Sequence, residues 1–190
     1  MKFIHHSKAA VLQEIEDEVT FFTVPKLVSI NCVLYQKDKS SIDSKIKTLE
    51  YSPLLVVRSS AADEDGSVSS SAGEYDSFLN IPFNCPEKIT ESIDNVISSY
   101  EKKRPLLEQD EVIIQQMVEN TTMSGVIFTH DLNTGAPYYV INYDDQSGLT
   151  DTVTSGAGEY SNRTLFIHRG STEEIRSDRF TKLLQAVKEL

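Results

Sequence analysis

The spacing of apolar residues near the start of the chain predicts an amphipathic helix. Within residues 7–22, Leu12, Ile15, Val19 and Phe22 recur three or four positions apart, as on one face of a helix. Ser7 is suited to cap its start. The helix should end before Val24-Pro25, because the residue preceding a proline is pushed toward extended conformations.

Two further helices are expected later in the chain. One begins at Pro86, since proline fits the first turn of a helix. The other lies near residues 178–190. The side chains expected to face inward are Ile89, Ile93, Val96, Ile97 and Tyr100 in the first, and Phe180, Leu183, Leu184 and Val187 in the second.

Short apolar or alternating runs between these helices predict strands. The runs are residues 26–35, 54–60, 75–81, 112–118, 123–130, 137–143 and 164–168. Residues 36–45 are polar and predict a loop or a short helix start, residues 61–75 predict a long loop, and Asn133-Thr134-Gly135 marks a turn. Hairpin-linked strands flanked by helices indicate an α+β fold with an antiparallel sheet.

Composition narrows the class of protein. The 190 residues include 29 acidic and 18 basic side chains, for a formal net charge of −11. The length suits one compact domain or two small lobes. The acidic balance argues against nucleic-acid and membrane partners, both of which require a basic face. With no secretory signal and no apolar run approaching the ~20 residues of a membrane span, a cytoplasmic protein is expected. The two cysteines form neither a disulfide framework nor a metal clip.

Arg58 is the first candidate functional residue. It lies at the end of a predicted buried strand, is followed by Ser59, and precedes a loop of small residues. The arginine fork suits phosphate oxygens, and small residues let backbone amides approach the same anion. The alternative is an ordinary ion pair between Arg58 and an acidic residue in 63–65.

Lys8 and Asp151 are weaker candidates on their own. Lys8 lies at the start of a predicted helix, where a lysine adds charge to an end that attracts anions; it could equally be a surface lysine. Asp151, with Asp144 and Asp145 upstream, supplies hard oxygen ligands of the kind Mg²⁺ uses. The alternative is a solvated acidic loop.

Other common catalytic arrangements are missing from the sequence. The four histidines do not form a catalytic set, and no serine or cysteine lies in a nucleophile-elbow motif. Neither GxGxxG nor GxxxxGK[ST] occurs, which removes the usual dinucleotide-fold and P-loop interpretations.

Taken in order, several segments resemble the N-terminal ATP-binding domain of phosphoenolpyruvate synthase and pyruvate phosphate dikinase. KAAVLQEI is similar to the opening GGKGxxLxxL, VP to VPxGF, and VVRSSAADEDGSVSSSAGEYDSFLNI to VRSSAxxEDxxxxSFAGxxxTxLNV. VIIQQMV is similar to VVVQxMV, MSGVIFTHDLNTG to SGVxFTxxPxTG, and SGLTDTVTSG to GLGExVVxG. The chain departs from the pattern at His6-Ser7, Ser71, Thr150 and Asp151.

The resemblance implies an ATP-grasp-like fold, with two small lobes around a nucleotide cleft and residues 1–190 forming one such domain. Lys8 and Arg58 would then be catalytic and hold the ATP phosphates together with Ser59. The adenine would contact Gln115, Gln116, Met117 and Val118. Mg²⁺ would be held by Asp151 and Asp144.

The resemblance also implies a phosphotransferase. Mg·ATP would be cleaved and a phosphoryl group passed to a histidine on a separate carrier domain, in cis or in trans, and then to a small acceptor such as pyruvate. No segment like the carrier or acceptor domains is found, so a piece of a longer multidomain enzyme is expected. The alternatives are a kinase acting on another small acceptor, such as glutamine in surface polysaccharide synthesis, a degenerate nucleotide-binding module, or an acidic protein-binding scaffold.

Overall fold

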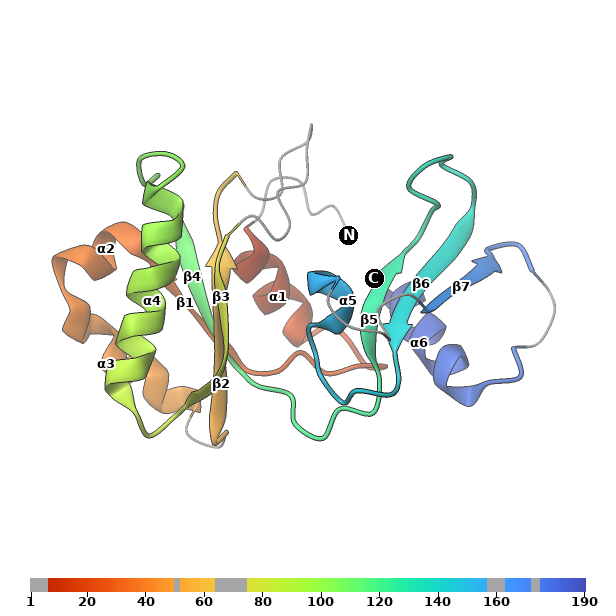
Figure 1. Ribbon diagram of the computed structural model, residues 1–190, viewed down its shortest axis with the longest axis horizontal. Helices are drawn as coiled ribbons and strands as arrows, with labels where there is room; N and C mark the ends of the chain where they lie inside the picture. The colour runs from red at the N-terminus through yellow and green to blue at the C-terminus, as the bar shows by residue number, and fades with distance from the viewer. Residues whose placement is uncertain (1–6, 50–51, 64–74, 157–162, 172–174) are drawn as a thin grey trace. The chain divides into compact units, whose positions relative to one another are not determined.

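A computed structural model describes residues 7–49, 52–63, 75–156, 163–171 and 175–190. The chain divides into two compact units. Unit 1 comprises Met1–Met117 and Lys182–Leu190, and unit 2 comprises Val118–Thr181 (Figure 1). The expected α+β class is confirmed, because each unit is built on an antiparallel sheet with helices beside it.

Unit 1 contains a four-stranded sheet in the order β1-β4-β2-β3. All its neighbouring strands run antiparallel. The strands are β1 (Leu27–Asn31), β2 (Leu54–Ser60), β3 (Ser77–Pro82) and β4 (Glu111–Gln116). The two central strands, β2 and β4, are nearly continuous runs of buried residues, as expected for strands covered on both faces.

Helix α4 (Pro86–Glu101) covers one face of this sheet and α1 (Lys8–Glu16) covers the other (Figure 1). The apolar face predicted for α4 is confirmed. Its five predicted inward residues are at most 3% exposed, and each such side chain contributes about 1.5–3 kcal/mol on burial. The residues under α1 form a smaller core consisting of Ala9, Ile15, Val24, Leu27 and Ile113.

Two predicted boundaries in unit 1 are corrected. The first helix ends at Glu16 rather than near residue 22, although Val19 and Phe22 still pack against the core under α1. The strand predicted over 26–35 stops at Asn31, because the Asn31 side chain accepts a hydrogen bond of 3.0 Å from Leu34 N and caps a new helix. The following short helices are α2 (Cys32–Lys37), η1 (Lys39–Ile42), α3 (Asp43–Ile46) and η2 (Lys47–Leu49).

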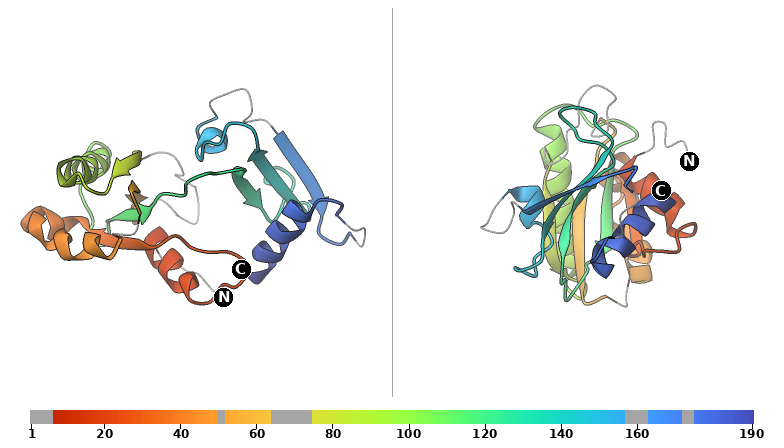
Figure 2. Two further views of the ribbon diagram at one scale, coloured as in Figure 1. Left: turned by 90° about the horizontal axis from the view of Figure 1, so that it is seen from below. Right: turned by 90° about the vertical axis from the view of Figure 1, so that its right-hand side faces the viewer.

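Unit 2 is built on the antiparallel sheet β5-β6-β7, whose strands lie side by side in Figure 2. The strands are β5 (Ser124–Phe128), β6 (Tyr138–Asp144) and β7 (Arg163–His168). The short helix α5 (Thr152–Ser155) packs on β5 and β6. The predicted turn between β5 and β6 is confirmed, with Gly135 at a φ of 69° and Asp131 accepting hydrogen bonds from Asn133 and Thr134.

Helix α6 (Asp178–Glu189) confirms the last predicted helix. Its first turn places the Phe180 ring against Tyr143 of β6, with centroids 5.2 Å apart. Phe180 and Leu184 are buried as predicted, whereas Leu183 and Val187 are only partly buried. Among the described helices, none is long and apolar enough to cross a membrane.

Candidate functional site

The end of β2 presents Arg58 to the sheet face that α1 covers. Arg58 lies opposite Ile113 on β4, and Ile113 belongs to the core under α1. Because side chains of directly opposed residues share a face, Arg58 projects toward the α1 side. Ser60 lies on this face as well, since side chains alternate along a strand.

The first turn of α1 is bonded directly to this strand end. Ala9 N donates a hydrogen bond of 3.1 Å to Ser60 Oγ, and this contact is buried. Lys8, the residue before Ala9, is therefore held near the end of the strand that carries Arg58. The structure thus brings together, within unit 1, the two segments that carry the predicted cationic residues.

The backbone amides that open α1 already have acceptors within the protein. Ser7 caps the helix as predicted, because its Oγ accepts from Ala10 N at 3.2 Å and its carbonyl accepts from Val11 N at 3.0 Å. The Ser7 hydroxyl also donates to Glu111 Oε2 at 2.7 Å. With the amides of residues 9–11 engaged, attraction of an anion to this end would rest on the Lys8 ammonium rather than on helix N–H groups.

Arg58 does not form the alternative ion pair with Asp63. Asp63 is bound instead by Arg104, and the other two acidic candidates, residues 64 and 65, lie outside the described residues. In the described part of the chain, no carboxylate is within ion-pair distance of Arg58. A half-buried guanidinium such as that of Arg58, which has no carboxylate partner among the residues that the structure describes, is suited to bind an anion.

Ser59 and Ser60 lie on opposite faces of β2. Ser59 is opposite Val112, whose side chain belongs to the core under α4, and Ser59 is only 4% exposed. The predicted ligand Ser59 therefore points away from the face that carries Arg58. Ser60, which the sequence analysis did not select, is the serine on that face, and alternation along the strand is the signal that would have identified it.

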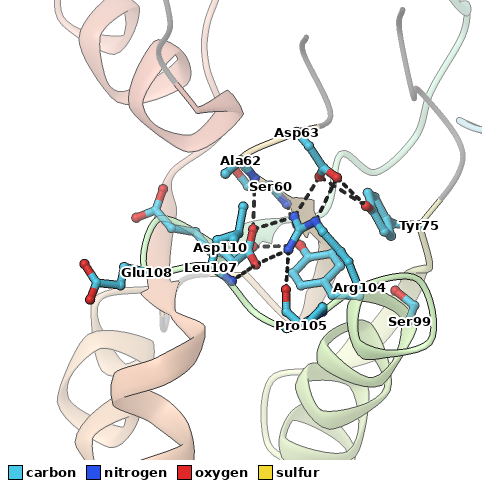
Figure 3. A network of polar contacts seen from close by, with 12 residues as sticks. Ser60, Ala62, Asp63, Tyr75, Ser99, Arg104, Pro105, Leu107, Glu108 and Asp110 are labelled. Atoms are coloured by element: carbon cyan, nitrogen blue, oxygen red, sulfur yellow. Dashed lines mark hydrogen bonds and ion pairs between the residues drawn. The ribbon is translucent and has the colours of Figure 1, made fainter.

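Arg104 forms a dense polar network at the same end of the sheet (Figure 3). Its guanidinium donates to both Asp63 oxygens at 2.8 and 2.7 Å and to both Asp110 oxygens at 2.7 and 2.8 Å. Asp110 is fully buried and also accepts from Ala62 N at 3.0 Å and Leu107 N at 2.7 Å. A buried carboxylate with this many donors is well satisfied.

The network shifts the ionisation of both carboxylates. Hydrogen bonding from Arg104 lowers the pKa of Asp63 to about 2. Burial raises the pKa of Asp110, but hydrogen bonds from Arg104, Ala62 and Leu107 outweigh it and leave that pKa below its usual value. Both groups are therefore charged at neutral pH. The sequence does not reveal this cluster, because a charged connection between a helix and a strand has no distinctive motif.

The segment predicted to line the adenine spans the end of β4 and the boundary between the units. Gln115 is buried, and its side-chain amide donates to Pro25 O at 2.9 Å. The backbone amides of Gln116 and Met117 donate to Lys26 O and Leu54 O. Val118 begins unit 2 and is 53% exposed. The role of this segment in binding adenine stays a prediction.

Asp144, predicted to hold a metal, is engaged by its own loop. Its buried carboxylate accepts from Gln146 N at 2.8 Å, Ser147 N at 3.0 Å and Thr152 Oγ1 at 2.7 Å, and also from the Ser147 hydroxyl. These bonds, that from the Ser147 hydroxyl above all, hold the pKa of Asp144 well below its usual range. The arrangement fits a residue that shapes the loop better than one that binds a metal directly.

Asp151 is more open than Asp144. It is exposed, precedes α5, and makes no side-chain cap hydrogen bond to that helix. Thr152, the next residue, is fixed by its bond to Asp144. Among the described residues, no cluster of three or more histidine, cysteine or acidic side chains is placed to hold a metal ion. Asp151 therefore offers one hard oxygen ligand, which suits Mg²⁺ only when phosphates or water complete the shell.

Comparison with known proteins supports a nucleotide-binding family. Residues 34–187 match the family described as the AMP/ATP-binding domain of pyruvate phosphate dikinase. The match includes Arg58, Asp144 and Asp151, and it begins after Lys8.

A curated relative is the prodigiosin synthesizing transferase PigC of Serratia marcescens. It is 29% identical over 109 residues, a stretch that covers 54% of this chain and 12% of the relative. The chain thus corresponds to a small part of that protein. The family match, by contrast, covers most of the chain. The chain therefore belongs to the pyruvate phosphate dikinase AMP/ATP-binding domain family.

Proposed function

We propose that the chain binds Mg·ATP and supplies the ATP-cleaving part of a phosphoenolpyruvate synthase-like phosphotransferase. The observation that carries the proposal is the hydrogen bond from Ala9 N to Ser60 Oγ. It holds the helix start that carries Lys8 against the strand end that carries Arg58, as a site for one polyphosphate requires.

Arg58 and Lys8 would have different tasks at this site. The planar guanidinium of Arg58 can bind two phosphate oxygens at once, whereas the Lys8 ammonium acts as a point charge. Phosphoryl transfer depends mainly on positioning and on offsetting negative charge. Arg58 meets the requirement for positioning because it projects from a buried strand of the sheet.

Unit 2 would supply a magnesium ion with only part of its ligand set. Asp151 would contribute an exposed carboxylate oxygen, and Asp144 would hold the adjoining loop through Thr152. A bound Mg²⁺ would offset charge on the phosphate oxygens.

The later steps would require groups outside the described residues. We propose that the phosphoryl group passes to a histidine of a carrier domain and then to a small acceptor such as pyruvate. In the described residues, His130 and His168 are engaged locally: His130 Nε2 lies 3.0 Å from Arg169, and His168 Nδ1 accepts from Gly170 N. Neither is assigned as the phosphocarrier, and an acceptor such as glutamine is the main variant of this proposal.

A second candidate function is a nucleotide-binding module without turnover. The occupied amides at the start of α1 and the Glu111 carboxylate bonded to Ser7 favour it, because both weaken attraction of a phosphate to the helix end. Binding alone would then persist through Arg58.

The experiment is a thermal unfolding titration of the chain with Mg·ATP, with Arg58→Ala and Lys39→Ala as test and control variants. Lys39 is an exposed lysine of the same unit, paired with Asp94. A ligand-dependent rise in Tm in the parent and control, and its loss in Arg58→Ala, supports the proposal. No rise in the parent contradicts it. Release of AMP and phosphate in a protein that also contains carrier and acceptor domains, only with the right acceptor, would separate the enzyme from the module.

A further inference from the structure

We propose that Arg104 is a positioning residue for nucleotide binding, acting through Asp63 and Asp110 on the end of β2. This inference rests on the proposed function, since it concerns the geometry of the same site. Arg104 does not share the sheet face of Arg58; it follows α4 in the connection to β4.

The guanidinium of Arg104 joins two segments that are distant in sequence. Asp63 lies just beyond the end of β2, and Asp110 lies just before the start of β4. Arg104 donates two hydrogen bonds to each, and one more to Pro105 O at 3.1 Å. Because the guanidinium is planar and its donors have fixed directions, the relative position of the two carboxylates is fixed as well.

Tyr75 brings a third segment to the same cluster (Figure 3). Its hydroxyl lies 3.1 and 3.2 Å from the two Asp63 oxygens, and its ring meets the Tyr100 ring edge-on with centroids 4.8 Å apart. Asp63 and Tyr75 are the described residues on either side of residues 64–74. Both sides of that segment are therefore held by one network.

Hydrogen bonds, joined by the short backbone stretches 60–62 and 110–111, lead from this network to the site. Asp110 accepts from Ala62 N at 3.0 Å, and Tyr100 Oη accepts from Ser60 N at 2.9 Å. Tyr100 also donates to Glu111 O at 2.8 Å. Ser60 in turn accepts from Ala9 N. The backbone two residues after Arg58 is thus held from one side by the network and from the other by α1.

The cluster of Arg104 with Asp63 and Asp110 is ionic, which suits a role in positioning the end of β2 better than a role in stability alone. Replacing a buried ion pair with apolar residues often leaves a protein equally stable, so such a pair is weak evidence for stability alone. The planar guanidinium of Arg104 does fix the directions of both carboxylates, and in enzymes a misplacement of about 1 Å by a remote substitution can cost roughly a hundredfold in rate. Arg104 would therefore affect the ATP dissociation constant without touching ATP.

The test compares the ATP dissociation constant with the melting temperature in four forms of the full chain. Arg104→Lys retains the positive charge but removes the planar guanidinium with its several N–H donors. Tyr75→Phe removes one hydroxyl and retains the ring. Ile89→Val lies in the core at the opposite end of α4 and serves as a destabilised control. Calorimetric titration with Mg·ATP is done at a temperature where every form is folded.

The expected result is a rise of about tenfold in the dissociation constant of Arg104→Lys and a smaller rise in Tyr75→Phe. Ile89→Val should bind as the parent does despite its lower melting temperature. Unchanged binding in both network variants, with only their melting temperatures lowered, would overturn the inference and leave the proposed function intact. If Arg104→Lys does not fold, Tyr75→Phe decides. A parent chain that binds no ATP overturns the proposed function and this inference together.

Discussion

The amide of Ala9 and the hydroxyl of Ser60 form a buried hydrogen bond of 3.1 Å between residues 51 positions apart. This contact ties the start of the first helix to an interior strand, and it orders the polar end of the unit 1 sheet. Lys8 precedes one partner and Arg58 precedes the other by two residues.

Arg58→Ala is expected to weaken ATP binding by about 10- to 100-fold, since hydrogen bonds to charged groups contribute about 1.5–3 kcal/mol. The free energy of unfolding should change by less than about 1 kcal/mol, because no ion pair of Arg58 is found in the described residues. Titration calorimetry and urea unfolding measure the two quantities. Unchanged ATP binding in this variant would remove Arg58 from the site.

Asp151→Asn is expected to raise the Mg²⁺ concentration needed for ATP binding, because an amide is a weaker ligand for a hard cation than a carboxylate. Melting temperature without ligand should barely move, since Asp151 is exposed and makes no cap bond. Titrating Mg²⁺ at constant ATP measures the effect. If the Mg²⁺ requirement is unaltered, Asp151 is not a ligand, and Asp145 becomes the next acidic residue to test.

Asp144→Asn is expected to lower the stability of unit 2 in the absence of any ligand. An asparagine has one acceptor oxygen where the carboxylate has two, and four donors now converge on Asp144. Hydrogen exchange of the amides of Gln146 and Ser147 should become faster. Protection equal to that of the parent would mean that the loop does not depend on this carboxylate.

Acid should destabilise unit 1 through Asp63. Its pKa is about 2 when folded and about 3.9 in an unfolded chain, so its contribution is complete above about pH 5 and is lost progressively as the pH falls toward 2. Asp63→Asn should therefore show a shallower loss of unfolding free energy between about pH 4.5 and pH 3. Urea unfolding at several pH values measures this. Ile89→Val should shift the whole curve without changing its slope.

The two cysteines should differ in reactivity toward a thiol reagent. Burial, with a smaller contribution from Asp110, raises the pKa of Cys32 to about 12, and its side chain is fully buried. Cys85 is partly exposed, and both thiols are free. One thiol per folded chain is expected to react, and Cys85→Ser should abolish that reaction. Rapid labelling of Cys32 in folded protein would contradict the buried position of the thiol.

The fold could be predicted largely because local patterns decide it. The five apolar positions of α4 repeat at helical spacing, and β2 was predicted with the bounds that it has, Leu54–Ser60. The error at residues 26–35 has a local cause as well. Apolar residues continue past Asn31 through Tyr35, but the Asn31 side chain accepts a hydrogen bond from Leu34 N and caps a helix there.

The candidate site could be predicted less completely, because its contacts join distant segments. No local pattern pairs Arg104 with Asp63, or Ser60 with Ala9. The face occupied by Ser59 also depends on its register with Val112. The sequence therefore indicates which residues have suitable chemistry, and the structure shows which of them lie together.

The link between Asp63 and Tyr75 suggests how this protein could be re-engineered. A segment whose two ends are joined at its base can be exchanged for one of different length at a modest entropic cost, because the remainder of the chain does not have to adjust. The stretch between these two residues is thus a natural place to graft loops from other members of this family while leaving the sheet intact.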